Sequence, residues 1–505
     1  MKTIAIISDS APDISAAKWA TNLRRDNCRV RCAHRLRGQV RTAYSRQAVK
    51  ISIRVVILLL LIGNVWGSWG LAGEIPVMNV PIATIPGVAL KPDADIRAID
   101  FTVDEQESLH LVWIVNQSSS GSAKEQVFYT RGDKGGASWS QPLELTDACQ
   151  QFVRILVMPD GVHIFCGNKL RHFLSRDRGN SWKELASLLS DAGGYAAAFD
   201  AVGIDSSLVV TYFGHSFDPA GGISKVLDLS VIRGTGDNFG APVRIASFSG
   251  DSFAPLKLVA NGKHLHLLCA VNSEQQIKEK NYTQFESSAQ LFYLQSKDSG
   301  ITWSSPIEAS RWTTQGGTLI PGSIQHIGGN IELLPLEQEW FAFYHETYLY
   351  MTHTVDGSTW FPAVNITPYE PSSLAAAFYS RSVSTAAING RGRLAWIDSR
   401  YRKSDRRWWK PLGGWPWSDA PDWANNDIFT IPLSDIVAIV RGDQQTQHTI
   451  IPQRLTQPLS YADQVQLRAS RTRIFAIWSG RRKVGKQIDT FEQPAELFYT
   501  VLPLP

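Results

Sequence analysis

The chain has 505 residues, of which 44% are hydrophobic and 19% charged, and its formal net charge at pH 7 is +4. This mild positive charge gives no argument for a nucleic-acid partner, and 5 cysteines are too few for a disulfide scaffold. The length exceeds that of a typical single domain, so the chain must form several domains or one repeat architecture.

The first 73 residues have the order of a signal peptide. Residues 1–48 are rich in arginine and show no sustained periodicity. Lys50 and Arg54 then precede the apolar run Val55–Ile62, and small residues follow at 72–73. A charged region, an apolar region and a small-residue cleavage site are the three parts of a secretory signal.

The leader therefore predicts export to a periplasmic or extracellular location. Residues 49–73 are interpreted as a signal peptide, because the apolar run is short for a membrane span. An uncleaved membrane anchor through residues 55–67 is the alternative. We hypothesise that the basic leader 1–48 is absent from the native protein.

A short pattern, Ser-x-Asp-x-Gly-x-x-Trp, recurs along the rest of the chain. Ser175–Trp182 and Ser296–Trp303 match it fully, whereas 131–139, 353–360 and 236–242 keep parts of it. An aspartate carboxylate can bond to turn amides, glycine permits a positive φ, and tryptophan can hold the turn against the layer beneath. The residues assigned this structural role are Asp133, Trp139, Ser175, Asp177, Gly179, Trp182, Ser296, Asp298, Gly300, Trp303, Asp356, Gly357 and Trp360.

The spacing of these turns is typical of propeller blades. Their aromatic residues lie at positions 139, 182, 239, 303 and 360, so successive turns are 43, 57, 64 and 57 residues apart. A four-stranded blade needs roughly 40–50 residues plus loops. The turns resemble the Asp boxes of sialidase-like (BNR-repeat) β-propellers, and the resemblance covers about residues 94–505. It implies a propeller fold, with these turns on the face opposite the active site.

The alternation of apolar and polar residues predicts an all-β fold, namely a β-propeller of four-stranded blades over 94–505. Seven blades are favoured and six are the alternative, although the resemblance implies six. The predicted first strands are Ile96–Val103, Phe152–Met158, Ala196–Val202, Leu256–Ala260, Ile324–Ile327, Ser382–Ile388 and Val465–Ala469. Residues 74–93 are interpreted as a closing strand and linker, in which Pro76–Pro86 completes the last blade. We expect a monomer.

One face of this propeller is predicted to bind ligand. Long connections between second and third strands fall at 116–125, 214–224, 272–289, 398–427 and 479–495. Long loops on one face usually mark the binding face. The same face receives Arg97, Arg154, Arg381, Asp398, Arg400 and Arg481. Arginines there can hold a ligand carboxylate; alternatively, each pairs with a loop carboxylate and anchors its loop.

The connection 398–427 is rich in tryptophan and basic residues, with Trp408 and Trp409 among them. Aromatic rings stack on sugar rings, and basic groups suit acidic sugars. The alternative is that the tryptophans pack on one another as a small separate core, because exposed tryptophans would promote aggregation. The predicted partner is a glycan or glycoconjugate of acidic character.

The family resemblance implies a catalytic set. Sialidases hold the substrate carboxylate with three arginines, attack with a tyrosine paired with a glutamate, and protonate the leaving group with an aspartate. Phe378-Tyr379-Ser380 resembles the nucleophile motif, so Tyr379 is the candidate nucleophile, Glu346 its activator and Asp100 the acid. Arg97 lies where the family has Arg-Ile-Pro, but the proline is missing here. The alternative for Tyr379 is an inner-strand tyrosine that packs the channel.

No zinc motif, phosphate loop or Ser-His-Asp signature is evident, so neither a metal nor a cofactor is predicted. Buried free thiols are favoured for Cys149 and Cys166 over a disulfide formed after export. Two functions remain open. One is an exo-glycosidase with a sialidase-type retaining mechanism. The other is a non-catalytic propeller that binds a glycan or an envelope protein through the Trp-rich loop 402–423.

Overall fold

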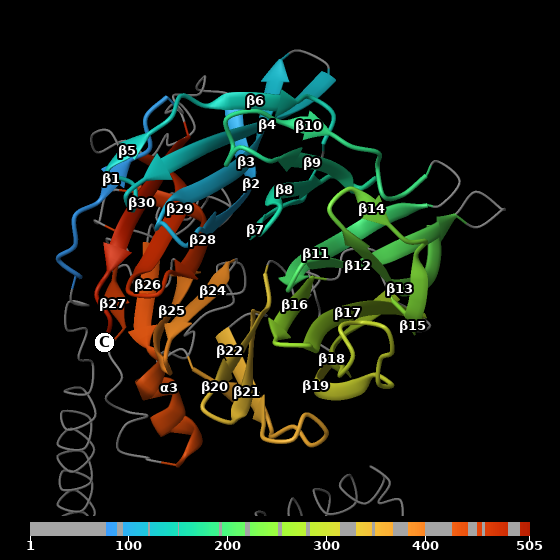
Figure 1. The fold of residues 1–505 in the computed structure, drawn as a ribbon. Coiled ribbons are helices and arrows are strands. Elements are labelled where there is room, and N and C mark those ends of the chain that lie inside the picture. The colour runs from blue at the N-terminus through green and yellow to red at the C-terminus, as the bar shows by residue number, and fades with distance from the viewer. Residues whose placement is uncertain are drawn as a thin grey trace, which may run out of the picture. The chain divides into compact units, whose positions relative to one another are not determined.

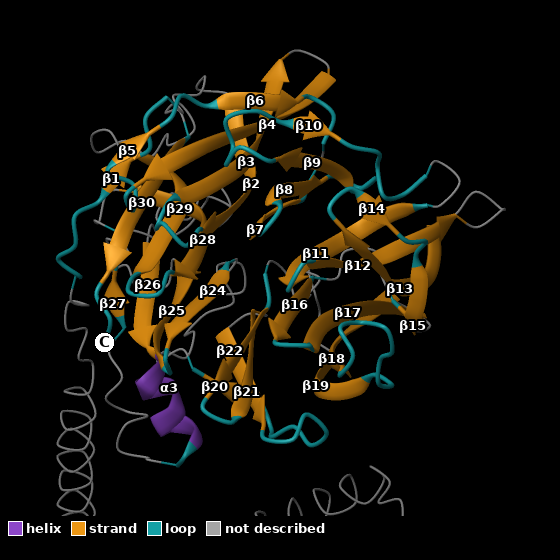
Figure 2. Ribbon diagram, viewed as in Figure 1, coloured by secondary structure: helices purple, strands orange, loops and turns teal. Residues whose placement is uncertain are grey.

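The structure is a computed structural model in which residues 75–505 form one compact unit. It describes residues 77–87, 94–119, 122–149, 151–190, 194–217, 223–250, 255–278, 283–313, 330–345, 349–366, 382–398, 427–442, 452–456, 460–482 and 495–505. The predicted leader and signal peptide, residues 1–73, lie outside the described residues. Figures 1 and 2 show that the described chain is built of strands, with a short helix α3 (Leu433–Val440).

The strands form seven antiparallel sheets, each of four or five strands. Blade one contains β2 (Ala94–Val103), β3 (Leu109–Ser119), β4 (Ser122–Asp133), β5 (Ser138–Trp139) and β6 (Leu143–Thr146). Blade two contains β7 (Val153–Met158), β8 (Gly161–Cys166), β9 (Arg171–Ser175) and β10 (Lys183–Glu184). Blade three contains β11 (Tyr195–Ile204), β12 (Ser207–Phe217), β13 (Ile223–Thr235), β14 (Asn238–Phe239) and β15 (Val243–Ser249).

The other four blades follow the same order. Blade four contains β16 (Leu256–Asn261), β17 (His264–Lys278), β18 (Thr283–Ser296) and β19 (Ile307–Thr313). Blade five contains β20 (Glu332–Leu336), β21 (Glu339–His345), β22 (Leu349–Thr354) and β23 (Val364–Asn365). Blade six contains β24 (Val383–Ile388), β25 (Arg391–Asp398), β26 (Asp427–Pro432) and β27 (Gln453–Arg454). Blade seven contains β28 (Ser460–Ala469), β29 (Ile474–Arg482), β30 (Glu496–Leu502) and β1 (Ala83–Thr84).

The blades close into a ring around the propeller axis. Each first strand contacts the first strand of the next blade, in the order β2, β7, β11, β16, β20, β24 and β28, and β28 contacts β2 again. Figure 1 shows the sheets arranged around a common centre. The predicted all-β propeller of four-stranded blades is confirmed, and the number of blades is seven.

The ring is completed by residues from both ends of the propeller sequence. In β1, Ala83 pairs with Tyr499 and Thr84 with Phe498 of β30. The Ile85 amide donates to the Leu497 carbonyl oxygen at 2.8 Å, which extends this pairing by one residue. The strand β1 therefore covers what would be the open edge of β30, and such an edge would otherwise be a site for pairing with other chains.

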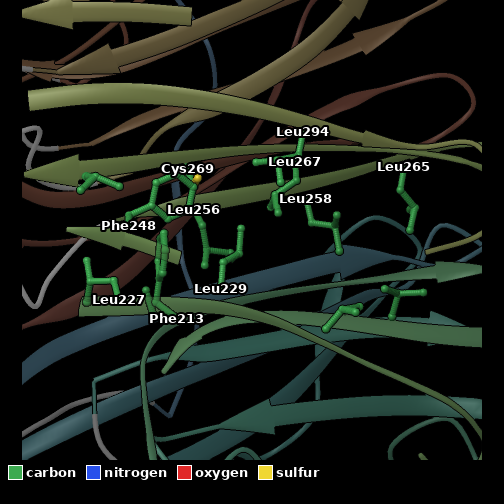
Figure 3. Close-up of a cluster of buried hydrophobic side chains, with 14 of the residues drawn as sticks. Phe213, Leu227, Leu229, Phe248, Leu256, Leu258, Leu265, Leu267, Cys269 and Leu294 are labelled. Atoms are coloured by element: carbon green, nitrogen blue, oxygen red, sulfur yellow. The ribbon is translucent and has the colours of Figure 1, made fainter. Parts of the chain in front are cut away.

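Alternate residues of each strand face the two neighbouring blades, so every interface between blades is an apolar layer. Figure 3 shows the layer between blades three and four. Phe213, Leu227 and Phe248 of blade three meet Leu256 and Leu267 of blade four there. These layers hold the ring together and fix the position of each first strand at the axis.

The structure corrects the first strand of blade five. It is β20, Glu332–Leu336, and not the predicted Ile324–Ile327, which lies outside the described residues. Pro335 lies within this segment, and a proline in the sequence normally argues against a strand. Proline is tolerated in an edge strand because one side of that strand has no ladder partner, and β20 is the edge strand of its sheet.

Three of the predicted loops are largely strand. The hairpins β3–β4, β12–β13 and β17–β18 continue to Ser119 opposite Ser122, Phe217 opposite Ile223, and Lys278 opposite Thr283. The predicted connections 116–125, 214–224 and 272–289 are therefore mostly paired backbone. Their sequences lack apolar alternation, which was the signal used. Once the buried part of a hairpin has set the register, its exposed part can continue the backbone pairing without apolar alternation.

The interpretation of Cys149 and Cys166 as free thiols is wrong. The two residues form a disulfide, with their Cα atoms 5.6 Å apart. Cys149 lies on the connection between blades one and two, and Cys166 ends β8. The bond therefore ties the connection to the second blade, and both residues are fully buried.

Candidate functional site

The first strands carry six charged side chains at the propeller axis, which we call the charged belt. They are Asp100, Arg154, Asp200, Lys257, Glu332 and Arg468, on β2, β7, β11, β16, β20 and β28. From blade one to blade five the charge of these side chains alternates between negative and positive, starting with the negative Asp100. Blade seven, which lies next to blade one, contributes the positive Arg468. Blade six contributes uncharged serine and threonine side chains at this level.

Four of the six belt side chains form one connected ion-pair network. Arg154 Nε lies 2.6 Å from Asp200 Oδ1, and its Nη1 lies 3.4 Å from Asp100 Oδ1. Arg468 Nη2 lies 2.6 Å from the same Asp100 oxygen. Asp100 therefore joins the arginines of blades two and seven, and Arg154 joins Asp100 to blade three.

The other two, Lys257 and Glu332, form a second pair, and hydrogen bonds continue from there to blades six and seven. Lys257 Nζ lies 2.9 Å from Glu332 Oε2, and Thr385 Oγ1 lies 3.5 Å from the same oxygen. Between blades six and seven the Leu467 amide donates to Ser384 Oγ at 2.9 Å. The belt thus connects neighbouring first strands over most of the ring.

The belt carboxylates also accept backbone hydrogen bonds from the next blades. The Ile155 amide donates to Asp100 Oδ2 at 3.0 Å, and the Leu258 amide donates to Asp200 Oδ2 at 2.9 Å. These amides belong to first strands, whose axis-facing edge has no strand partner. Both oxygens of Asp100 therefore have partners in neighbouring blades.

The belt presents its cations to solvent more than its anions. The exposed fractions of the Arg154 and Arg468 side chains are 18% and 24%, whereas Asp100 keeps 2%. Lys257 keeps 13% and its partner Glu332 keeps 4%. Burial disfavours the charge of Arg154, but Asp200 and Asp100 outweigh it and raise the pKa of the guanidinium above its ordinary value. The belt is neutral as a set, yet the groups that water reaches are mainly positive.

A second charged group lies on the face where first strands begin and second strands end, which we call the loop face. Arg97 Nε and Arg481 Nη2 each lie 3.7 Å from a carboxylate oxygen of Asp95. Arg481 also donates to the Ala94 carbonyl oxygen at 3.0 Å. The Arg97 side chain is 52% exposed and that of Arg481 is 6% exposed. Arg97 is therefore the accessible cation of this group.

The structure brings some of the predicted site residues together. Asp100 and Arg154 meet in the belt, and Arg97 and Arg481 meet around Asp95. Asp398 is fully buried at the end of β25, opposite Asp427 of β26. The other predicted residues, Tyr379, Glu346, Arg381, Arg400, Trp408 and Trp409, lie outside the described residues.

The sequence analysis missed five members of these two groups, namely Asp95, Asp200, Lys257, Glu332 and Arg468. A usable signal was present, since Asp200 and Lys257 stand as single charges inside apolar strands. Such a residue in a buried strand must find a charged or hydrogen-bonding partner. Recognising the same feature in successive first strands would have indicated the belt.

The repeated turns lie on the opposite face, where third strands lead to fourth strands. Ser175 Oγ and the Ser181 amide both donate to Asp177 Oδ1 at 2.8 Å, and the Gly179 amide donates to Ser175 Oγ at 2.6 Å. The bonds from the Ser181 hydroxyl and amide hold the pKa of Asp177 at about 2. The turn at Ser296 has the same bonds, and the pKa of Asp298 is likewise lowered to about 2, chiefly by the Thr302 hydroxyl.

The tryptophans of these turns join neighbouring blades. Trp182 of blade two packs edge-on against Tyr129 of blade one, with 4.8 Å between ring centres. Trp360 packs in the same way on Tyr293 of blade four, at 5.3 Å, and Trp139 of blade one on Tyr499 of blade seven, at 5.4 Å. The hydrogen bonds of these turns hold the turns themselves, and the ring contacts join neighbouring blades, which is a structural role.

Within the described part of the chain, no three His, Cys, Asp or Glu side chains gather as they would around a metal ion. The described helices also include none with the length and apolar character needed to cross a membrane.

No family model and no curated protein matches the sequence. Among solved structures, the chain is similar to a sialidase from Trypanosoma rangeli, at 10% identity and a TM-score of 0.38, over 83% of this chain and 60% of that one. A sialidase from Streptococcus pneumoniae has 10% identity and a TM-score of 0.38, over 85% of this chain and 70% of that one. An α-L-arabinofuranosidase from Fusarium graminearum has 11% identity and a TM-score of 0.36, over 85% of this chain and 98% of that one.

These neighbours are propeller glycosidases. The chain spans about 60% of the length of the T. rangeli sialidase. Similarity at this level says nothing about the activity or ligand of the present chain, which must be argued from its own residues.

Proposed function

We propose that this protein is an exported propeller that binds an acidic glycan at the propeller axis, approached from the loop face. The observation that carries the proposal is the unequal exposure of the charged belt. The exposed fraction is 18% for Arg154 and 24% for Arg468, and 2% for Asp100 between them. A carboxylate arriving at the axis would meet guanidinium groups before it met their anionic partners.

The loop face adds one accessible cation. Arg97 lies on β2, the same strand that carries Asp100, and its side chain is 52% exposed. A guanidinium with free donors offers a planar, two-point contact to a carboxylate. Arg97 is therefore the side chain that we assign to first contact with the acidic sugar.

Binding is favoured over hydrolysis for the described residues. Arg154 and Arg481 are already paired with Asp100, Asp200 and Asp95. A catalytic clamp works best when its donors are preorganised for the ligand alone, whereas binding needs only the exposed parts of Arg97, Arg154 and Arg468. Hydrolysis with Tyr379 as nucleophile remains the second candidate, because the Phe378-Tyr379-Ser380 motif supports it.

Two observations support export. The leader has the order of a signal peptide. The buried disulfide between Cys149 and Cys166 suits an oxidising compartment, where such bonds persist. We therefore expect the ligand to be a glycan outside the cytoplasm.

Binding of sialyllactose and of lactose to the full chain tests the proposal. We expect sialyllactose to bind more tightly, and Arg97→Met to weaken it by about tenfold, since one charge-assisted contact is lost. Arg244→Met is the matched control. Arg244 also lies 3.7 Å from an aspartate and is 67% exposed, but it is on the outer edge of blade three. Equal binding of the two sugars, or no binding of either, would contradict the proposal.

The same preparation decides between binding and hydrolysis. Turnover of a fluorogenic sialoside by the wild-type protein, lost in Tyr379→Phe, would make the protein a tyrosine-nucleophile glycosidase. Saturable binding without turnover would leave it a glycan-binding propeller.

A further inference from the structure

The outer strands of three blades share one irregularity. β6 on β4, β15 on β13 and β19 on β18 each contain a β-bulge at the same point of the pairing. The extra residues are Leu145, Ile245 and Ala309, which have no partner in the register. A bulge changes the direction of the side chains around it. Leu145, Ile245 and Ala309 each pack in the apolar layer shared with the following blade.

Next to two of the bulges, side chains of neighbouring blades contact one another. Between blades one and two, Arg171 donates from Nη1 to Thr146 Oγ1 and from Nε to Glu184 Oε1, both at 2.8 Å. Between blades three and four, Phe248 packs on Phe292, with ring centres 4.8 Å apart.

Beside the bulge of blade four, an open crevice between blades four and five has a volume of about 450 Å³. We call it the rim crevice. The lining residues used below are Glu308, Ser310 and Arg311 of β19, and Tyr344, Tyr350 and Phe361 of blade five. Pockets of roughly 300–1,000 Å³ are typical of small-molecule sites. This size accommodates a sugar unit.

Aromatic rings form one side of the rim crevice. Tyr344 and Tyr350 stack, with ring centres 5.7 Å apart and planes at 19°. Tyr344 Oη lies 2.8 Å from Ser310 Oγ, and this contact connects the two blades. Phe361 is 47% exposed although it is a large apolar side chain. Phe361 is thus the accessible ring, whereas Tyr344 is only 4% exposed.

A carboxylate and a guanidinium form the other side. Arg311 donates from Nε to Glu308 Oε1 at 2.9 Å and from Nη2 to Glu308 Oε2 at 2.5 Å. Residues three apart would point to opposite faces of a regular strand. The bulge at Ala309 brings them to the same face, where Gln290 Nε2 also donates to Glu308 at 3.2 Å. The pair has no net charge and offers both donors and acceptors.

We propose that the rim crevice binds one sugar unit of an uncharged polysaccharide. A sugar ring has an apolar face that packs on aromatic rings and an edge of hydroxyl groups that donate and accept hydrogen bonds. The crevice offers an aromatic side and a neutral donor–acceptor pair, so an uncharged sugar fits it better than an acidic one. The site lies on the outer strand β19, at the opposite edge of the sheet from the first strand β16, and does not depend on the ligand of the axis.

Binding of hexasaccharides of glucose, galactose and N-acetylglucosamine to the full chain, followed by tryptophan fluorescence, tests this proposal. We expect at least one of them to bind saturably, and both Glu308→Gln and Phe361→Ala to weaken that binding by about tenfold. Glu144→Gln is the matched control. Glu144 holds the corresponding place beside the bulge of blade one and accepts from Gln126 Nε2 at 2.8 Å.

The outcomes separate this site from the axis. Arg97→Met should leave hexasaccharide binding unchanged, and Glu308→Gln should leave sialyllactose binding unchanged. Failure of sialyllactose to bind would therefore count only against the axis proposal. The rim crevice proposal would be overturned if none of the three hexasaccharides bound, if Glu308→Gln had no effect, or if Glu144→Gln weakened binding equally.

Discussion

At the scale of single residues, the glycine of the repeated turn has two structural duties. Gly179 has a φ of +88°, in the region that other residues rarely adopt. A Cβ atom there would also lie 1.9 Å from Tyr129 Oη of the preceding blade. That hydroxyl group is fixed by a 2.8 Å bond with His110 Nδ1, so it cannot move aside without losing a partner. The glycine therefore allows both the turn and the contact between blades.

Replacing this glycine separates the two effects. We expect Gly179→Ala to lower the free energy of unfolding by about 2–4 kcal/mol, combining a left-handed alanine with overpacking. Gly390→Ala is the control, because Gly390 has a φ of +77° but no atom within 4 Å of the added Cβ. Gly390→Ala should lower the free energy of unfolding by only about 1 kcal/mol. Chemical denaturation of both variants measures the difference. An equal loss in the free energy of unfolding would mean that the contact with Tyr129 does not contribute to stability.

At the scale of elements, the charged belt gives each first strand a partner that its own sheet does not provide. A first strand pairs with its second strand on one edge and faces the axis with the other. Asp200 crosses this gap, since it accepts the Leu258 amide of blade four and pairs with Arg154 of blade two. Asp100 of blade one likewise accepts from the Ile155 amide and pairs with Arg154, both of blade two. The belt thus replaces hydrogen bonds that a continuous sheet would supply.

Removal of one belt carboxylate should therefore be costly. We expect Asp200→Ala to lower the free energy of unfolding by about 3–5 kcal/mol, because Arg154 would lose its closest ion-pair partner and a buried amide would lose its acceptor. Asp237→Ala is the control on the same blade, since Asp237 is exposed, and should change the value by about 0.5 kcal/mol or less. Thermal unfolding of the two variants checks this. A similar melting temperature for both would show that the belt does not hold the blades together.

At the scale of the whole molecule, buried histidines recur in several blades and make stability depend on pH. Burial lowers the pKa of His172 to about 3 and that of His266 to about 4. Burial also lowers the pKa of His110, His163 and His353. These groups stay neutral in the folded chain at pH values where an unfolded histidine, with a pKa near 6.5, is already charged. Acid therefore favours the unfolded state.

We expect the free energy of unfolding to fall as the pH drops below about 6.5, by roughly 1.4 kcal/mol per pH unit for each histidine that stays neutral. The turn aspartates do not contribute in this range. Since the pKa of Asp177 is lowered to about 2, its stabilisation is lost only at more acidic pH, below the ordinary carboxyl range near 4.

Urea denaturation at pH 7 and pH 5 measures the effect, and His266→Gln should show a smaller difference between the two pH values than the wild-type protein. Equal stability at pH 7 and pH 5 in the wild-type protein would contradict the expectation.

The sequence alone determined the fold class, because its signals are local and repeat. The turn residues Asp177, Gly179 and Trp182 recur at blade spacing, and each acts within its own few residues. Strand alternation then located most first strands, including those that begin at Val153 and Leu256. It failed at β20, where Pro335 obscured the pattern, and in the extended hairpins, which lack apolar residues to reveal them.

Only the tertiary structure decided which charges meet. Asp100, Arg154 and Arg468 are up to 368 positions apart in the chain, and ring closure brings them into contact. The disulfide partner of Cys149 and the open crevice beside Ala309 depend in the same way on how neighbouring blades pack. Local propensity cannot indicate such pairs, because the position of each partner is set by the packing of whole blades around the axis.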